Sequence, residues 1–199
     1  MEIKACELCP RRCRAFRSAE EGGGFCRMGA DAVVARAALH YWEEPCLSGT
    51  RGSGAVFFTG CSLGCVFCQN YSISTQREVG KRVSPQELSD IFLSLEKQGA
   101  HNINLVNPTH FAPAVAEALK LRRPGIPVVY NSGGYERVET LRELEGLIDI
   151  YLPDLKYLSP ELSRRYSGAE NYPQAAMPAI LEMARQTGPA VFDGDGILQ

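Results

Sequence analysis

The chain has 199 residues, of which 45% are hydrophobic and 22% charged, and its formal net charge is -2 at pH 7. This near-neutral balance excludes a global attraction to nucleic acid or to an anionic membrane surface, and the ordinary apolar content excludes a disordered chain. No run of about 18 apolar residues predicts a membrane span, and the N-terminus lacks the apolar stretch of a signal peptide. We therefore expect a globular cytoplasmic protein without nucleic-acid or membrane partners.

The N-terminal segment is rich in cysteine. All eight cysteines lie in the first 68 residues, and in a reducing compartment such clustering favours metal binding over disulfide bonds. The first group has the spacing C-x2-C-x3-C-x12-C and consists of Cys6, Cys9, Cys13 and Cys26. Four thiols can close a zinc site or hold an iron–sulfur cluster, and the spacing leaves these two alternatives and idle thiols open. Nearby arginines either place cations beside the thiolates or form a small basic patch for a partner: Arg11, Arg12, Arg14 and Arg17.

We divide the chain into a cysteine-rich N-terminal segment, residues 1–50, and a repeating part, residues 51–199. Within the first part, Cys46 stands alone and is expected to be a buried thiol, and Trp42 is expected in the core. The repeating part opens with a β-type run at residues 55–58.

A second cysteine group directly follows this first predicted strand. Cys61, Cys65 and Cys68 have the spacing C-x3-C-x2-C. Three thiolates can hold three corners of a [4Fe-4S] cluster and leave one iron open to a substrate. A zinc site with a fourth ligand from elsewhere and buried thiols without metal remain as alternatives.

Helical and strand patterns alternate after residue 80. Ser84, Pro85 and Glu87 predict a helix start, and Gly99 predicts its end. The following elements are expected to be strand 103–106, helix 112–122, strand 126–130, helix 136–145, strand 147–152, and helices from residue 159 and over 173–187. Such alternation predicts an α/β fold with a parallel sheet, open or curved into a barrel, whose ligands lie in the loops after positions 58, 106, 130 and 152. The last ten residues predict a hairpin that the chain does not complete, so we expect a barrel truncated at the C-terminus.

The second cysteine group has an aromatic residue, Phe67, just before its last cysteine. A C-x3-C-x-aromatic-C loop at the end of the first strand of a βα repeat resembles the signature of radical S-adenosylmethionine enzymes. The resemblance implies a partial (β/α) barrel of the radical SAM type and a [4Fe-4S] cluster held by Cys61, Cys65 and Cys68. It also implies that S-adenosylmethionine binds the open iron, with Phe67 near its adenine, and is cleaved reductively to a 5′-deoxyadenosyl radical that abstracts hydrogen.

Several further segments are similar to uncharacterised proteins related to pyruvate formate-lyase activating enzyme. They are residues 40–46, 52–58, 68–70, 102–110, 129–136 and 149–157. This narrower resemblance implies an oxidoreductase with a reductant such as flavodoxin or ferredoxin, and it raises activation of a glycyl radical in a protein substrate as one reaction.

The resemblance also suggests binding and catalytic residues at the ends of later strands. Asp154 and Lys156 match an Asp-x-Lys motif of glycyl-radical activating enzymes, although a surface pair is the alternative. The Gly-Gly-Glu motif that often holds the methionine amino group is replaced by a loop in which Asn107 and Thr109 could serve. His110 either faces the pocket or caps the following helix.

Two other functions are alternatives to the radical enzyme. One is a non-catalytic scaffold in which both cysteine groups bind zinc or iron–sulfur clusters. The other is a radical enzyme that modifies nucleic acid, which the absence of a basic stripe in the sequence disfavours.

Overall fold

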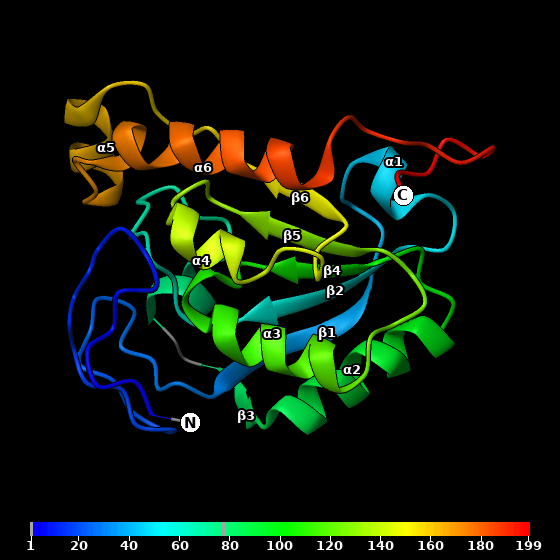
Figure 1. Ribbon diagram of the computed structural model, residues 1–199, viewed down its shortest axis with the longest axis horizontal. Helices are drawn as coiled ribbons and strands as arrows, with labels where there is room; N and C mark the ends of the chain where they lie inside the picture. Colours follow the sequence, from blue (N-terminus) through cyan, green and yellow to red (C-terminus); the bar gives the residue numbers. More distant parts are fainter. Residues whose placement is uncertain (1, 77–78) are drawn as a thin grey trace.

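A computed structural model, which describes residues 2–76 and 79–199, places one mixed sheet at the centre of the protein (Figure 1). The six strands lie in the order β3-β1-β2-β4-β5-β6. Their bounds are β1 (Ala32–His40), β2 (Ser53–Phe58), β3 (Lys81–Val83), β4 (Ile103–Val106), β5 (Val128–Ser132) and β6 (Ile150–Pro153). Strands β2, β4, β5 and β6 are parallel, whereas β1 runs antiparallel to both β2 and β3. The predicted α/β class with parallel strands is confirmed.

Helices α2 (Pro85–Lys97), α3 (Ala112–Leu121) and α4 (Val138–Arg142) connect the parallel strands. Helix α1 (Pro45–Ser48) lies between β1 and β2, and α5 (Pro160–Ser167) and α6 (Tyr172–Thr187) follow β6. A π-helical turn lies at Ser72–Gln76 and a 3-10 turn at Thr109–Phe111. Helices α2 and α3 pack side by side, and α6 lies against α4, α5 and β6 (Figure 1). No helix of the described residues is long and apolar enough to cross a membrane.

Helix α2 illustrates how the sequence specifies these elements. The Glu87 backbone N–H donates to the Ser84 hydroxyl at 3.2 Å, and the Ser84 backbone N–H donates to the Glu87 carboxylate at 2.8 Å. This capping box satisfies N–H groups that have no partner inside the helix. The inward side chains Leu88, Phe92 and Leu95 are buried in the main hydrophobic core with residues of the sheet and α3. Both the predicted start of the helix and its predicted buried face are correct.

Strand β1, which is rich in alanine, was not predicted from the sequence. Alanine is depleted in strands, so the pattern of residues 32–40 carries little strand signal. In the structure β1 pairs with β2 on one side and β3 on the other, so strand pairing continues across residue 50. The expectation that Trp42 belongs to the core is wrong, because 89% of its surface is exposed just after β1.

The end of the chain folds as the predicted turn. Phe192 and Leu198 form an antiparallel bridge, and the Asp193 N–H donates to the Ile197 carbonyl at 2.9 Å. Leu198 also donates its N–H to the Cys46 carbonyl at 2.9 Å. Cys46 is partly buried there, and packs against a small apolar cluster beside β5 and β6.

The N-terminal segment lies next to the carboxyl ends of the parallel strands. In Figure 1 the arrows of β2, β4 and β5 point toward the side on which the blue N-terminal loops lie. Arg17 makes this contact directly, since its Nη2 donates to the His110 carbonyl just after β4 at 2.8 Å. Any site at this edge of the sheet therefore has the N-terminal segment as a neighbour.

The stability of the sheet should depend on the buried face of α2. Leu88→Ala removes a side chain with no exposed surface, so it should lower the free energy of unfolding by about 2–5 kcal/mol. Leu181→Ala, at a site in α6 that is 67% exposed, is the matched control and should cost less than about 1 kcal/mol. Urea unfolding of both variants would test this, and equal losses would contradict the assigned core.

Candidate active site

A large cavity opens at the carboxyl ends of the four parallel strands. Its volume is about 850 Å³. The loops that follow these strands line it, with Cys61 after β2, Asn107 after β4, Gly133 after β5, and Asp154 and Lys156 after β6. The loops that the sequence predicts to bind ligands thus line a cavity at that edge.

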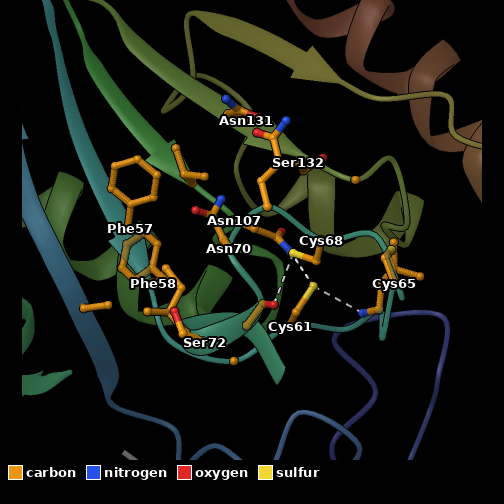
Figure 2. A pocket seen from close by; sticks show the side chains of 18 of the residues that line it. Phe57, Phe58, Cys61, Cys65, Cys68, Asn70, Ser72, Asn107, Asn131 and Ser132 are labelled. Carbon is orange, nitrogen blue, oxygen red and sulfur yellow. Dashed lines mark hydrogen bonds between the residues drawn. The ribbon is translucent and has the colours of Figure 1, made fainter. Parts of the chain in front are cut away.

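Three thiols from one loop face this cavity. Cys61, Cys65 and Cys68 all line it, and Figure 2 shows their side chains in the loop that follows β2. Gly60 begins the loop with a φ of +84°, and a Cβ there would lie 2.6 Å from the Met28 side chain, so the tight entry requires glycine. The loop rests on a cluster of buried aromatic and small side chains: Leu63, Tyr135, Tyr157, Ala169, Tyr172 and Ala176.

Each of these thiols has a hydrogen-bonding partner from a different part of the chain. The partners are Asn107 Nδ2, 2.9 Å from Cys61 Sγ, Ser167 Oγ, 2.9 Å from Cys65 Sγ, and Ser74 Oγ, 3.2 Å from Cys68 Sγ. Cys61 also accepts from the Leu63 backbone N–H at 3.3 Å. Donors aimed at sulfur stabilise the thiolate form and orient it, as the outer partners of metal ligands do.

The chemistry of these thiols suits bound metal. Burial raises the pKa of Cys61 to about 12, so its thiolate form requires a nearby positive charge such as a metal ion. An iron–sulfur cluster takes each thiolate on a different iron. The three thiols on one cavity wall could hold three corners of a [4Fe-4S] cluster.

A buried series of hydrogen bonds connects Glu136 to Cys61 through Thr109 and Asn107. Asn107 Oδ1 and Glu136 Oε1 each lie 2.7 Å from the Thr109 hydroxyl, whose single proton can be donated to only one of them. The arrangement is complete if Glu136 is protonated and donates to Thr109, which then donates to Asn107, whose amide donates to Cys61. Burial raises the pKa of Glu136 to about 7, which favours the protonated carboxyl that this series of hydrogen bonds requires.

Two residues expected at the site lie behind it. Thr109 and His110 are buried, with 1% and 2% of their surfaces exposed, and neither lines the cavity. Thr109 contacts Asn107, and the His110 ring nitrogen Nε2 lies 2.8 Å from the Thr59 carbonyl. Thr109 can thus act on a ligand through Asn107, and His110 neither faces the pocket nor caps a helix through its side chain.

The other expected residues lie on the cavity wall. Lys156 Nζ donates to Asp154 Oδ2 at 2.5 Å. Burial by itself would lower the pKa of Lys156, but Asp154 raises it above its ordinary value, so the ammonium stays charged. Phe67 is 55% exposed, lines the cavity, and has its ring 6.3 Å from that of Tyr157.

The structure adds wall residues that the sequence did not single out. His40 and Glu43, at the end of β1 and just after it, line the cavity, and Asn131 Nδ2 lies 3.4 Å from Glu43 Oε2. The exposed Trp42 stands beside them at the cavity rim. Their only sequence signal was the resemblance of residues 40–46 to other proteins, because β1 itself was not predicted.

The first group of cysteines gathers at a separate place. The four thiols line a second cavity of about 20 Å³: Cys6, Cys9, Cys13 and Cys26. Ser62, which follows Cys61 in the chain, lines the same cavity.

The raised pKa of Glu136 predicts a specific pH dependence of stability. Between pH 4.5 and about 7 the folded protein holds a proton on Glu136 that the unfolded chain releases, so this carboxyl lowers the free energy of unfolding as pH rises. Glu136→Gln should remove that loss. Within this window, the free energy of unfolding of the variant should rise relative to that of the wild type by roughly 1.4 kcal/mol per pH unit. Urea unfolding from pH 4.5 to 8 would measure the gain.

Comparison of the wild type with Glu136→Gln isolates the contribution of the Glu136 carboxyl to the pH dependence of stability. The pKa of His110 is lowered to about 3 by burial, so His110 makes stability rise with pH between about 3 and 6.5, but it does so in both proteins and cancels. A difference that stays constant from pH 4.5 to 8 would mean that Glu136 is ionised throughout.

Comparison with known proteins agrees with this geometry. Residues 55–194, which include the thiol loop, match the Radical SAM superfamily. An uncharacterized protein of Methanocaldococcus jannaschii is 34% identical over 179 residues, which cover 85% of this chain and 51% of the archaeal protein. The chain thus spans about half the length of that relative. The six-stranded, mostly parallel sheet is consistent with a partial β/α fold of this type, and the chain belongs to the radical SAM superfamily.

Proposed function

We propose that this chain cleaves S-adenosylmethionine reductively and uses the resulting radical to abstract hydrogen from a substrate. The radical SAM domain implies a [4Fe-4S] cluster and S-adenosylmethionine. The observation that carries the proposal is the placement of Cys61, Cys65 and Cys68 on the wall of the 850 Å³ cavity at the carboxyl ends of the parallel strands. In this proposal the three thiolates bind the cluster, which supplies the electron for the cleavage when it is bound.

The chain's own residues would hold the thiolates and exclude water. Asn107 and Ser167 donate to the sulfurs of Cys61 and Cys65 from separate segments, which limits the movement of the loop. Leu63 and Cys65 are buried in the aromatic cluster beneath the loop. Exclusion of water on that side protects a reactive radical from side reactions.

The cavity wall offers a binding site for S-adenosylmethionine, which carries a carboxylate, an amino group and an adenine ring. Its carboxylate would pair with the Lys156 ammonium, and its amino group with oxygen atoms such as that of the Asn107 amide. Phe67 would pack against the adenine. Asp154 would keep Lys156 charged and aimed at the ligand.

The specific reaction that we propose is hydrogen abstraction from a glycine of a protein partner, as in glycyl-radical activating enzymes. The cavity wall supports a macromolecular substrate, because it includes two exposed aromatic side chains: Trp42 and Phe67 are 89% and 55% exposed. Exposed aromatic residues are frequent at sites where proteins bind one another. A reductant such as flavodoxin or ferredoxin would supply the electron to the cluster.

Replacement of one cysteine proposed to bind the cluster should abolish the cleavage of S-adenosylmethionine. Anaerobically reconstituted Cys65→Ala, with dithionite and S-adenosylmethionine, should form 5′-deoxyadenosine more than about 100-fold more slowly than the wild type, since even outer partners of metal ligands contribute 10- to 100-fold. Cys46→Ala, whose thiol lies outside both cysteine groups, is the control and should keep wild-type activity. Wild-type turnover by Cys65→Ala, or a colourless wild-type protein that holds only zinc, would refute the proposed enzyme.

Loss of the cavity ammonium should weaken ligand binding without removing the cluster. Lys156→Met should raise the Kd for S-adenosylmethionine about 10- to 100-fold, which corresponds to one charge-assisted hydrogen bond. Lys97→Met, at the exposed end of α2, is the matched control and should leave the Kd unchanged. Equilibrium dialysis of the reconstituted proteins measures both Kd values. An unchanged Kd for Lys156→Met would show that this lysine lines the cavity without binding S-adenosylmethionine.

A further inference from the structure

We infer that the four N-terminal cysteines form a second iron–sulfur site, separate from the large cavity. Their side chains line one small cavity of about 20 Å³: Cys6, Cys9, Cys13 and Cys26. They come from loops of the N-terminal segment, and the proposed reaction at the other three thiols makes no use of them. Four thiols on the wall of one cavity are a donor set that thiophilic metals favour.

Backbone and side-chain donors point at these sulfurs. The Phe25 N–H donates to Cys13 Sγ at 3.3 Å, and Arg17 Nη1 donates to Cys6 Sγ at 3.5 Å. Backbone hydrogen bonds also reach Cys9 from Arg11 and Cys26 from Met28. Hydrogen bonds to ligand sulfurs stabilise thiolates and set the potential of iron–sulfur clusters.

The backbone beside two of the cysteines has a conformation that favours glycine, yet arginine occupies both positions. Arg14 follows Cys13 with a φ of +50°, and Arg27 follows Cys26 with a φ of +54°. Non-glycine residues adopt this region rarely and at a cost in energy, and such strain persists where surrounding structure holds it in place. Ligation of the preceding cysteine would provide that constraint.

The charge of the site also fits an anionic cluster. Arg17 is only 1% exposed, and besides Cys6 its guanidinium contacts backbone carbonyl groups, those of Met28 at 3.0 Å and His110 at 2.8 Å among them. Burial of a guanidinium is costly unless negative charge lies close to it. Four thiolates around iron and sulfide would supply negative charge beside Arg17.

The size of the cavity that these thiols line favours a cluster over a single zinc ion. Four sulfurs at the Zn–S distance of about 2.3 Å lie about 3.8 Å from one another and leave no room for a water molecule between them. The small cavity, whose wall the four thiols share with residues such as Leu8 and Phe25, has about 20 Å³, which is enough for a water molecule. Cluster irons would bind sulfurs that are set around such a space.

The second site lies directly behind the loop of the three cavity thiols. Ser62 lines the small cavity, and its neighbour Cys61 lines the large one. Arg11 strengthens the contact, because its Nε donates to the Ser62 carbonyl at 2.9 Å and its Nη2 to the Ser167 carbonyl at 3.1 Å. A cluster at the N-terminal cysteines would therefore brace this loop from the side opposite the cavity.

Metal analysis of a variant without the other three thiols tests the inference. Cys61→Ala/Cys65→Ala/Cys68→Ala, reconstituted anaerobically with iron and sulfide, should retain equal amounts of iron and acid-labile sulfide, two or four of each per chain. Addition of Cys9→Ala and Cys13→Ala should remove both, and addition of Cys46→Ala should remove neither. Zinc without sulfide in the triple variant, or no metal, would overturn the inference.

The wild-type protein provides a second measurement if the larger variants do not fold. Fully reconstituted wild type should hold two to four more irons per chain than the four that the cavity thiols would account for. A wild type that saturates at four irons would contradict a second cluster. The formation of 5′-deoxyadenosine by the same preparation reports on the proposed reaction alone, so the two proposals can fail separately.

Discussion

The hydrogen bonds that reach Cys61 and Cys65, two of the three cavity thiols, from distant segments are the interactions on which the site depends. The loop from Cys61 to Cys68 cannot define its own shape, because it contains little regular hydrogen bonding. Asn107 lies after β4 and Ser167 ends α5, so the positions of the Cys61 and Cys65 sulfurs follow from the placement of those elements. Correct assembly of the sheet and α5 is therefore a condition for a thiol triad of the right shape.

The sequence predicted this edge of the sheet because carboxyl ends of parallel strands share one side. It could not predict which side chains face the cavity. Asn107 and Thr109 are only two residues apart, yet the 3-10 turn at Thr109–Phe111 directs Thr109 away from the cavity and leaves Asn107 on its wall. Glu136 was expected to begin a helix, but the structure buries it beneath the strand ends, a placement that depends on contacts distant in sequence.

Strand β1 was missed for a different physical reason. Its alanines have weak strand propensity, and its partners β2 and β3 are contributed by residues on the other side of the predicted boundary at 50. Helix α2, in contrast, carries its own local signals in Ser84 and Glu87 and was predicted almost to the residue. Local capping chemistry can be read from the sequence, whereas pairing between distant segments follows from packing.

Protonation of Glu136 connects the stability of the fold to the geometry at Cys61. With a neutral Glu136, the Thr109 hydroxyl is free to donate to Asn107 Oδ1, which fixes the amide so that its nitrogen faces Cys61. With an ionised Glu136, the same hydroxyl would donate to the carboxylate, and the amide of Asn107 would lose the partner that defines its orientation. The penalty for ionisation of this buried carboxyl thus favours a directed hydrogen bond to sulfur, so a costly polar group of the core contributes to the order of the thiol loop.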